Sequence, residues 1–285
     1  MTKNQQRILW PALLTALLVV TALTFAASTK LRHAIATGIS SQSQAATLSA
    51  TRTAYVRRSL LSPKLVWNLK ALGDRLEKPG RERLTVTGAL SRAKESQPEE
   101  VAAVFEFPDR LRLTIQEGIQ TRVITFDGEQ ATSAGDPLDA AERDLIETLV
   151  YGTAEHFFTT QMQGQATRLL GSRFRIDDGS SVDYSGPYYD VYRVTEQIKT
   201  SAEQREQQKL YYFNSETLLL ERVRYEINRN GSAVKVEERL GDWVKEQGQQ
   251  VARRVERFEN GESVFVLTVS TAGLSARVAD GVFAQ

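Results

Sequence analysis

Residues that commonly perform catalysis are scarce in this sequence of 285 residues. It contains no cysteine, which excludes thiolate catalysis, disulfides and cysteine-based zinc sites. Its two histidines, His33 and His156, lie far apart in the chain, and His156 on a predicted helix is more simply a packed or exposed residue than a general base. No nucleophile elbow, phosphate-binding glycine loop or dinucleotide fingerprint occurs. We therefore expect neither catalytic residues nor a bound cofactor or metal.

Two polar or aromatic clusters carry weaker signals. The stretch from Asp177 to Asp183 offers several oxygen ligands for a cation but lacks the spacing of an EF-hand loop, so a plain turn is the simpler interpretation. Four tyrosines could rim the mouth of a ligand site, because tyrosine has an apolar body and a polar tip. Packing in the core or at a sheet edge explains them more simply; they are Tyr184, Tyr188, Tyr189 and Tyr192.

The chemistry that the sequence does favour is the burial of apolar surface. Side chains along a strand alternate between the two faces of a sheet, and several predicted strands carry apolar residues at every second position. We expect ten of these to face inward and bind a hydrophobic ligand: Phe105, Phe107, Leu111, Leu113, Ile115, Val234, Val236, Phe265, Leu267 and Val269. Their polar neighbours are expected to face water; in the first two strands these are Glu106, Arg110, Arg112 and Thr114.

The elements that must position these residues can be read from turn signals and periodicity. Ser62-Pro63 predicts the start of a helix that Lys78-Pro79-Gly80 ends. About four strands follow, and then two helices, opened by Asp136-Pro137 and by Gly152-Thr153. About seven strands complete the chain. Hairpins are predicted at Asn230-Gly231 and Asn260-Gly261, since both residue types tolerate positive φ.

This order of elements predicts an α+β fold with one large antiparallel sheet. About eleven strands are more than an open, twisted sheet usually holds without curling. We therefore expect a curled sheet, a half-barrel, covered on its concave side by helices. One run is apolar on both faces, because Leu210 and Tyr212 oppose Tyr211 and Phe213, and its second apolar face is expected to line an interior.

The N-terminus carries a separate signal. Lys3 and Arg7 precede an uncharged run of 20 residues, Ile8–Ala27. A cleaved signal peptide and an uncleaved membrane anchor both fit, and either would export the remainder to the periplasm or another extracytoplasmic compartment. Residues 28–61 are predicted to be a flexible tether and residues 62–285 one domain. The formal net charge of +1 gives no reason to expect a nucleic-acid partner.

Four stretches resemble the periplasmic lipoprotein-carrier (LolA-like) superfamily. They are FEFPDRLRL at 105–113, VITFDGEQATSAG at 123–135, KLYYFNSETLLLERVRY at 209–225 and the closing AGLSARVADGVFAQ. The resemblance covers about residues 62–285 and rests mainly on turns and strands. It implies a half-barrel of about eleven antiparallel strands closed by helices, with a hydrophobic cavity that accepts acyl chains.

Two functional hypotheses follow. The first is an exported, monomeric and non-enzymatic protein that holds an acyl chain, a lipid or a lipoprotein anchor in the concavity, and that meets a membrane or a membrane-bound partner. The second is a structural or sensory interaction module on the same fold with a filled core. The volume of the interior separates them, since a ligand site of about 300 Å³ or more favours binding.

Overall fold

The computed structural model describes residues 57–93, 95, 97–162, 165, 167–176, 186–199, 204–276 and 282–283. The predicted N-terminal segment and most of the tether lie outside these residues, as do Tyr184 and the loop from Asp177 to Asp183. Within the described ranges, no helix is both long enough and apolar enough to span a membrane.

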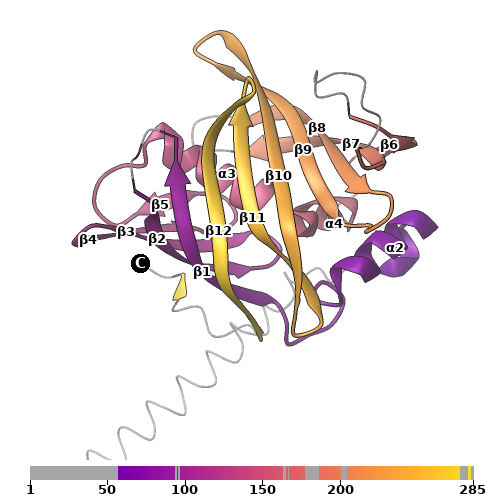
Figure 1. Ribbon diagram of the computed structural model, residues 1–285, viewed down its shortest axis with the longest axis horizontal. Helices are drawn as coiled ribbons and strands as arrows, with labels where there is room; N and C mark the ends of the chain where they lie inside the picture. Colours follow the sequence, from indigo (N-terminus) through magenta and orange to yellow (C-terminus); the bar gives the residue numbers. More distant parts are fainter. Residues whose placement is uncertain are drawn as a thin grey trace, which may run out of the picture. The chain divides into compact units, whose positions relative to one another are not determined.

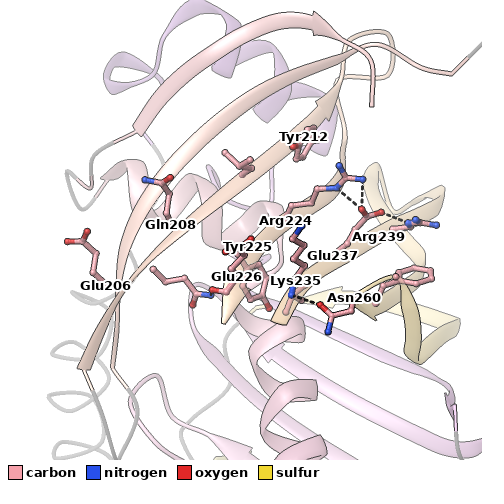
Figure 2. A pocket seen from close by; sticks show the side chains of 15 residues that line it. Glu206, Gln208, Tyr212, Arg224, Tyr225, Glu226, Lys235, Glu237, Arg239 and Asn260 are labelled. Atoms are coloured by element: carbon pink, nitrogen blue, oxygen red, sulfur yellow. Dashed lines mark hydrogen bonds and ion pairs between the residues drawn. The ribbon is translucent and has the colours of Figure 1, made fainter. Parts of the chain in front are cut away.

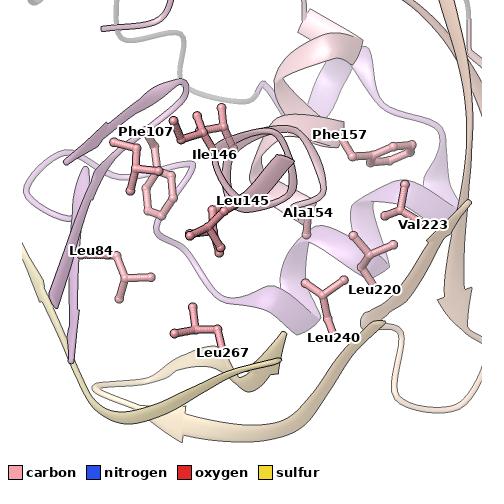
Figure 3. Close-up of a cluster of buried hydrophobic side chains, with 14 of the residues drawn as sticks. Leu84, Phe107, Leu145, Ile146, Ala154, Phe157, Leu220, Val223, Leu240 and Leu267 are labelled. Carbon is pink, nitrogen blue, oxygen red and sulfur yellow. The ribbon is translucent and has the colours of Figure 1, made fainter. Parts of the chain in front are cut away.

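Twelve antiparallel strands form one open sheet that curls around two helices (Figures 1 and 3). The predicted α+β fold with a curled antiparallel sheet is confirmed, with one strand more than expected, since β5 has only three residues. The elements are η1 (Arg58–Leu60), α2 (Pro63–Leu72), β1 (Arg83–Arg92), β2 (Glu99–Glu106), β3 (Arg110–Glu117), β4 (Gln120–Phe126), β5 (Ala131–Ser133), α3 (Ala140–Tyr151), α4 (Ala154–Met162), β6 (Thr167–Phe174), β7 (Tyr189–Lys199), β8 (Gln204–Asn214), β9 (Leu220–Arg229), β10 (Ser232–Glu246), β11 (Gln249–Glu259) and β12 (Glu262–Ser275).

Two meanders make up the sheet, and the pairing of β1 with β12 joins them. The strand order is β5-β4-β3-β2-β1-β12-β11-β10-β9-β8-β7-β6. Leu84 pairs with Leu274 and Leu90 with Leu267, so residues almost 200 positions apart are neighbours at the centre of the sheet. The segment with α3 and α4 connects the meanders and lies inside the curl, where it covers the concave face (Figure 3).

Irregular pairing bends the sheet at this central junction. The β1–β12 register shifts between Thr87 and Gly88. A Cβ atom at Gly88 would lie 2.0 Å from the carbonyl oxygen of Thr268, so the two backbones approach too closely for any side chain there. Further shifts occur in the β11–β12, β8–β9 and β6–β7 pairs. Because such bulges increase local twist and bend strands, their distribution accounts for the curl.

Both predicted hairpin turns are confirmed. Asn230 and Gly231 have φ values of 54° and 81°, and Asn260 and Gly261 have 51° and 91°. These are left-handed conformations, as a two-residue hairpin turn of the primed type requires.

The helix boundaries were predicted less well. Ser62 caps α2 as expected, but the helix ends at Leu72 because Gly73 has a φ of 110°. The prediction that it continues to Lys78 is wrong. Likewise, the N-cap of α3 is Asp139, which forms a reciprocal capping box with Glu142, rather than the Asp136-Pro137 pair.

The close approach at Gly88 predicts an asymmetry between two glycines of the central strand pair. We expect Gly88→Ala to destabilise the fold by about 1–3 kcal/mol, because the methyl group must displace the backbone of β12. Gly273→Ala is the matched control, since a Cβ there meets nothing within 4 Å. Urea unfolding of both variants measures the difference. Equal effects of the two substitutions would contradict the close-approach explanation.

The single-domain prediction can also be tested directly. A chain that begins at Ala54 should give a β-dominated circular dichroism spectrum and one cooperative unfolding transition, because strands from both ends of this segment pair at the centre of the sheet. Two separate transitions would show that the meanders fold independently.

Candidate ligand-binding site

The hydrophobic core lies between the concave face of the sheet and helices α3 and α4. Figure 3 shows Leu145 and Ile146 of α3 and Phe157 of α4 enclosed by strand side chains such as Leu84 and Leu267. Phe157 and Phe158 are fully buried, and Phe157 contacts three aromatic rings of β7 and β8. The inner face of the sheet is therefore covered over most of its area.

All ten predicted ligand-binding residues lie in or against this one core. The eight that are buried are Phe107, Leu111, Leu113, Ile115, Val236, Phe265, Leu267 and Val269. Phe105 and Val234 are partly buried and pack against the others. The structure thus brings the ten residues together, but only some of them adjoin empty space.

A partly open cavity of about 70 Å³ adjoins the core, near the C-terminal end of α3. Of the predicted residues, Phe105, Phe107, Leu267 and Val269 line it, and the other six do not. Its further apolar lining consists of Leu84, Val86, Leu149, Leu240, Trp243, Val251, Ala252 and Val255. Arg75, Thr148, Thr153 and Glu155 supply a polar side. The Arg75 Nε atom donates to Glu155 Oε1 at 2.7 Å, which links the segment after α2 to α4 across this side.

Trp243 lines the cavity next to an unusual backbone conformation in β10. Gly241 pairs with Arg254 and Trp243 with Ala252, while Asp242 between them has a φ of 52°. Leu240 and Trp243 line the same cavity although they are three residues apart. The indole Nε1 atom of Trp243 is buried and has no hydrogen-bond acceptor among the described residues. The wall thus contains a donor that is available to a ligand.

The sequence analysis missed a cluster of buried charges next to the core. Arg257 and Glu238 are both 0% exposed. Arg257 Nη1 donates to Thr148 Oγ1 and to the Tyr225 hydroxyl, both at 3.0 Å, and Tyr225 donates to Glu238 Oε1 at 2.7 Å. Burial raises the pKa of Glu238. The carboxylate lies where Gly152 would carry a side chain, since a Cβ there would be 2.0 Å from Glu238 Oε2.

A second group of buried charges continues this cluster onto β7 and β8. Glu196 Oε2 lies 3.2 Å from His156 Nε2 and 3.8 Å from Lys209 Nζ, and Glu196 Oε1 accepts from the Tyr211 hydroxyl at 2.7 Å. Burial alone raises the pKa of Glu196, but the charges of Lys209 and His156 and the hydrogen bonds outweigh it and hold this pKa at about 2. Lys209 also donates to the carbonyl of Tyr151, which links the end of α3 to the sheet.

These groups include residue types that act as acids and bases, but their placement indicates a structural role. Lys209, Glu196, Glu238 and Arg257 are at most 2% exposed and do not line the cavity. Their partners are main-chain carbonyls and side chains of the same cluster. The sequence did contain a signal for this burial, since Lys209 is on the same strand face as Tyr211, and Glu238 is on the same face as Val236. The sequence analysis assumed instead that a charged side chain faces water.

That assumption also fails at Glu106, which was expected to face water and is 1% exposed. Its carboxylate lies 3.2 Å from Arg83 Nη2 and 3.1 Å from Arg110 Nη1. Phe283, close to the C-terminus, covers these arginines, with its ring centroid 4.6 Å from the Arg110 guanidinium. Phe283 therefore covers this part of the outer face.

The second apolar face of β8 does not line the interior, contrary to the prediction. Leu210 and Tyr212 lie on the outer face of the sheet and line an open groove of about 940 Å³ (Figure 2). Most of its lining residues are polar or charged, and Arg224 and Arg239 both pair with Glu237 there (Figure 2). Tyr189 and Tyr192 are buried, in agreement with the packing interpretation of the tyrosine cluster.

Neither a comparison with protein-family profiles nor one with curated proteins finds a match. Among solved structures, a LolA superfamily protein from Nitrosomonas europaea is similar at a TM-score of 0.50 with 13% identity, covering 77% of this chain and 97% of that one. A lipoprotein-sorting domain from Vibrio parahaemolyticus has a TM-score of 0.43, 10% identity and coverages of 77% and 94%. A DUF1329 family protein from Desulfovibrio piger has a TM-score of 0.45 and 10% identity, and the match covers 81% of this chain and 98% of that one. The fold is LolA-like, as the sequence motifs indicated.

The buried cluster predicts unequal losses of stability when two of its glutamates are replaced. Glu196→Gln leaves Lys209 buried without its carboxylate and should cost about 3–5 kcal/mol of stability. Glu238→Gln removes a charge that burial disfavours, keeps an acceptor for Tyr225, and should cost about 1 kcal/mol or less. Urea unfolding at pH 7 compares the two. A larger loss in Glu238→Gln would contradict the assignment.

The low pKa of Glu196 also predicts how the stability of the fold depends on pH. The pKa of Glu196 lies at about 2, below the usual 4.5 of a glutamate, so its contribution is complete above about pH 4.5 and is lost as the pH falls towards 2. The stability difference between the natural protein and Glu196→Gln should shrink over that interval. A difference that is independent of pH would exclude this charge interaction.

Proposed function

We propose that this protein binds an acyl chain of a lipid or a lipoprotein in the concavity between its sheet and its helices. The supporting observation is the interior cavity, whose walls are apolar on both the sheet side and the α3 side. The LolA-like fold supports the same assignment, because the structure from Nitrosomonas europaea is named as a member of that superfamily. In this proposal the protein is exported, acts as a monomer and is not an enzyme.

Binding requires the cavity to enlarge. A volume of about 70 Å³ is well below the roughly 300 Å³ of typical small-molecule sites. We infer that the segment from Gly73 to Gly80 moves, because it carries Arg75, which pairs with Glu155 across the polar side of the cavity. Its displacement leaves the buried charges of β7–β11 paired. The cavity would then open beside Arg75.

The proposed site also accounts for the head of such a ligand. An acyl chain carries a carbonyl group, which accepts hydrogen bonds, and the Trp243 indole is a buried donor without an acceptor. The methylene chain would extend along Leu267, Val269 and Phe107. Burial of apolar surface at about 25 cal/mol per Å² supplies the driving force.

The small volume of the cavity also supports a second candidate function, an interaction module. A core with only about 70 Å³ of empty space is close to filled, as expected of an interaction module that binds no ligand. The two candidates differ in one property, since only the first requires that the interior admits an acyl chain.

The test is to fill the cavity. Lipids extracted from the natively purified protein should be identified by mass spectrometry, and the affinity for a fluorescent fatty acid should be measured by titration. We expect Ala252→Phe to weaken binding at least tenfold, because Ala252 lines the cavity. The matched control is Ala102→Phe at an exposed position of β2, which should leave binding unchanged.

Two outcomes would reject the proposal in favour of the interaction module. The first is the absence of bound lipid and of probe binding in the natural protein. The second is a probe affinity that Ala252→Phe does not alter while the variant remains folded.

A further inference from the structure

Exposed apolar side chains gather at one edge of the sheet. Six large apolar residues are strongly exposed among those that the structure describes: Leu60, Trp67, Ile119, Leu169, Leu170 and Phe174. Five of these belong to η1, α2 and β6. The sixth, Ile119, is in the turn between β3 and β4, near the other end of the strand order.

We name η1, α2 and β6 together the β6–α2 edge, to which these five residues belong. Lys64 at the start of α2 donates from Nζ to Ser172 Oγ of β6 at 2.7 Å, so the two elements are in contact. Lys64, Trp67 and Lys70 follow one another at intervals of three on the helix and therefore share a face. In Figure 1, α2 and β6 lie at the same side of the molecule. Along β6, exposed positions occur on both faces of the strand.

The charge of this edge is strongly positive, although the whole chain is nearly neutral. Five basic residues belong to α2 and β6 or directly follow β6: Lys64, Lys70, Arg168, Arg173 and Arg175. No acidic residue occurs in β6. The carboxylate beside Lys64 is that of Asp190, which is buried and pairs with this lysine at 2.6 Å. Arg173 and Arg175 lie over the ring of Tyr188, at 4.9 Å and 4.4 Å from its centroid.

The backbone of β6 is poorly suited to the addition of another strand. Its register with β7 shifts between Leu169 and Gly171 and again between Gly171 and Phe174, and Arg173 has a φ of 60°. The Phe174 ring packs where Gly171 would carry a side chain. Irregular edges of this kind oppose pairing between copies. The exposed side chains therefore need a partner that does not depend on a regular ladder.

We propose that the β6–α2 edge docks onto the surface of bilayers that contain anionic phospholipids. Aliphatic and aromatic side chains mixed with arginine and lysine match both parts of such a surface, since the former enter the acyl boundary and the latter contact the phosphates. The edge also lies close in the chain to the N-terminal segment, because η1 begins at Arg58. This docking goes beyond ligand binding in the concavity and does not depend on it.

The absence of cysteine makes the test direct, because a single introduced cysteine can be labelled. Leu170→Cys and Phe174→Cys would carry an environment-sensitive fluorophore in the full-length protein, with Ile119→Cys as the matched exposed control. The vesicles contain phosphatidylcholine with or without phosphatidylglycerol. The readout is the environment of the label, because the N-terminal segment by itself can hold the chain on a vesicle.

With phosphatidylglycerol present, labels at 170 and 174 should shift to the blue and be quenched by spin-labelled lipid, while a label at 119 should not change. In the Leu170→Cys background, Arg168→Glu with Arg173→Glu should weaken this response at least tenfold, since each basic residue contributes roughly fivefold. Arg143→Glu with Arg254→Glu, which changes net charge equally at exposed positions elsewhere, should have little effect.

Three results would overturn the proposal. One is a label at 170 that behaves like the label at 119. Another is an equal response of the two double charge variants. The third is a blue shift of the label at 170 that grows with protein concentration in the absence of vesicles, which would show that the edge pairs with a second copy of the chain.

Discussion

The fold depends on four ionisable side chains that have almost no contact with solvent. Glu196, Lys209, Glu238 and Arg257 project from β7, β8, β10 and β11 into the space beneath α3 and α4. Removing such charges from water costs several kcal/mol each unless every partner is in place. The helices supply essential partners, including the carbonyl of Tyr151 and the imidazole of His156. The curl of the sheet and the docking of the helices must therefore form together.

This constraint also decides which part of the interior can open. The ionic half of the concavity, under β7–β11, is fastened by contacts that each leave a buried charge if broken. The other half, under β1, β2 and β12, is held by apolar contacts, and the cavity lies at its border. On the cavity side, Arg75 pairs with Glu155, and it also donates to the Gln249 side chain and the Gln250 carbonyl of β11. A path beside Arg75 reaches the apolar walls without separating the four central charges from their partners.

The sequence predicted the parts of this structure that local chemistry determines. Turn residues fix φ within two or three positions, so the hairpins at Asn230 and Asn260 were found, and alternation placed Leu113 and Leu267 in the core. The buried charges were missed because their partners are distant, as for Arg257 and Thr148, which are 109 residues apart. A lone arginine on a strand is normally solvated, and only the helix above it makes burial possible. The shortest strand, β5, is stabilised by its neighbour β4 rather than by any pattern in Ala131–Ser133.

The two apolar faces of the β7–β8 pair are covered in different ways. The inner face packs Tyr192, Tyr211 and Phe213 against Phe157 of α4. On the outer face, Val191 is buried, and Leu170 and Phe174 border the same hollow of about 240 Å³ as Val191 and Leu210. An edge strand that covers an apolar patch must carry apolar side chains, and those beyond the patch have nothing to pack against. The exposure of Leu170 and Phe174 is thus a consequence of covering β7, and it creates the only edge of the described sheet at which several large apolar side chains meet water together.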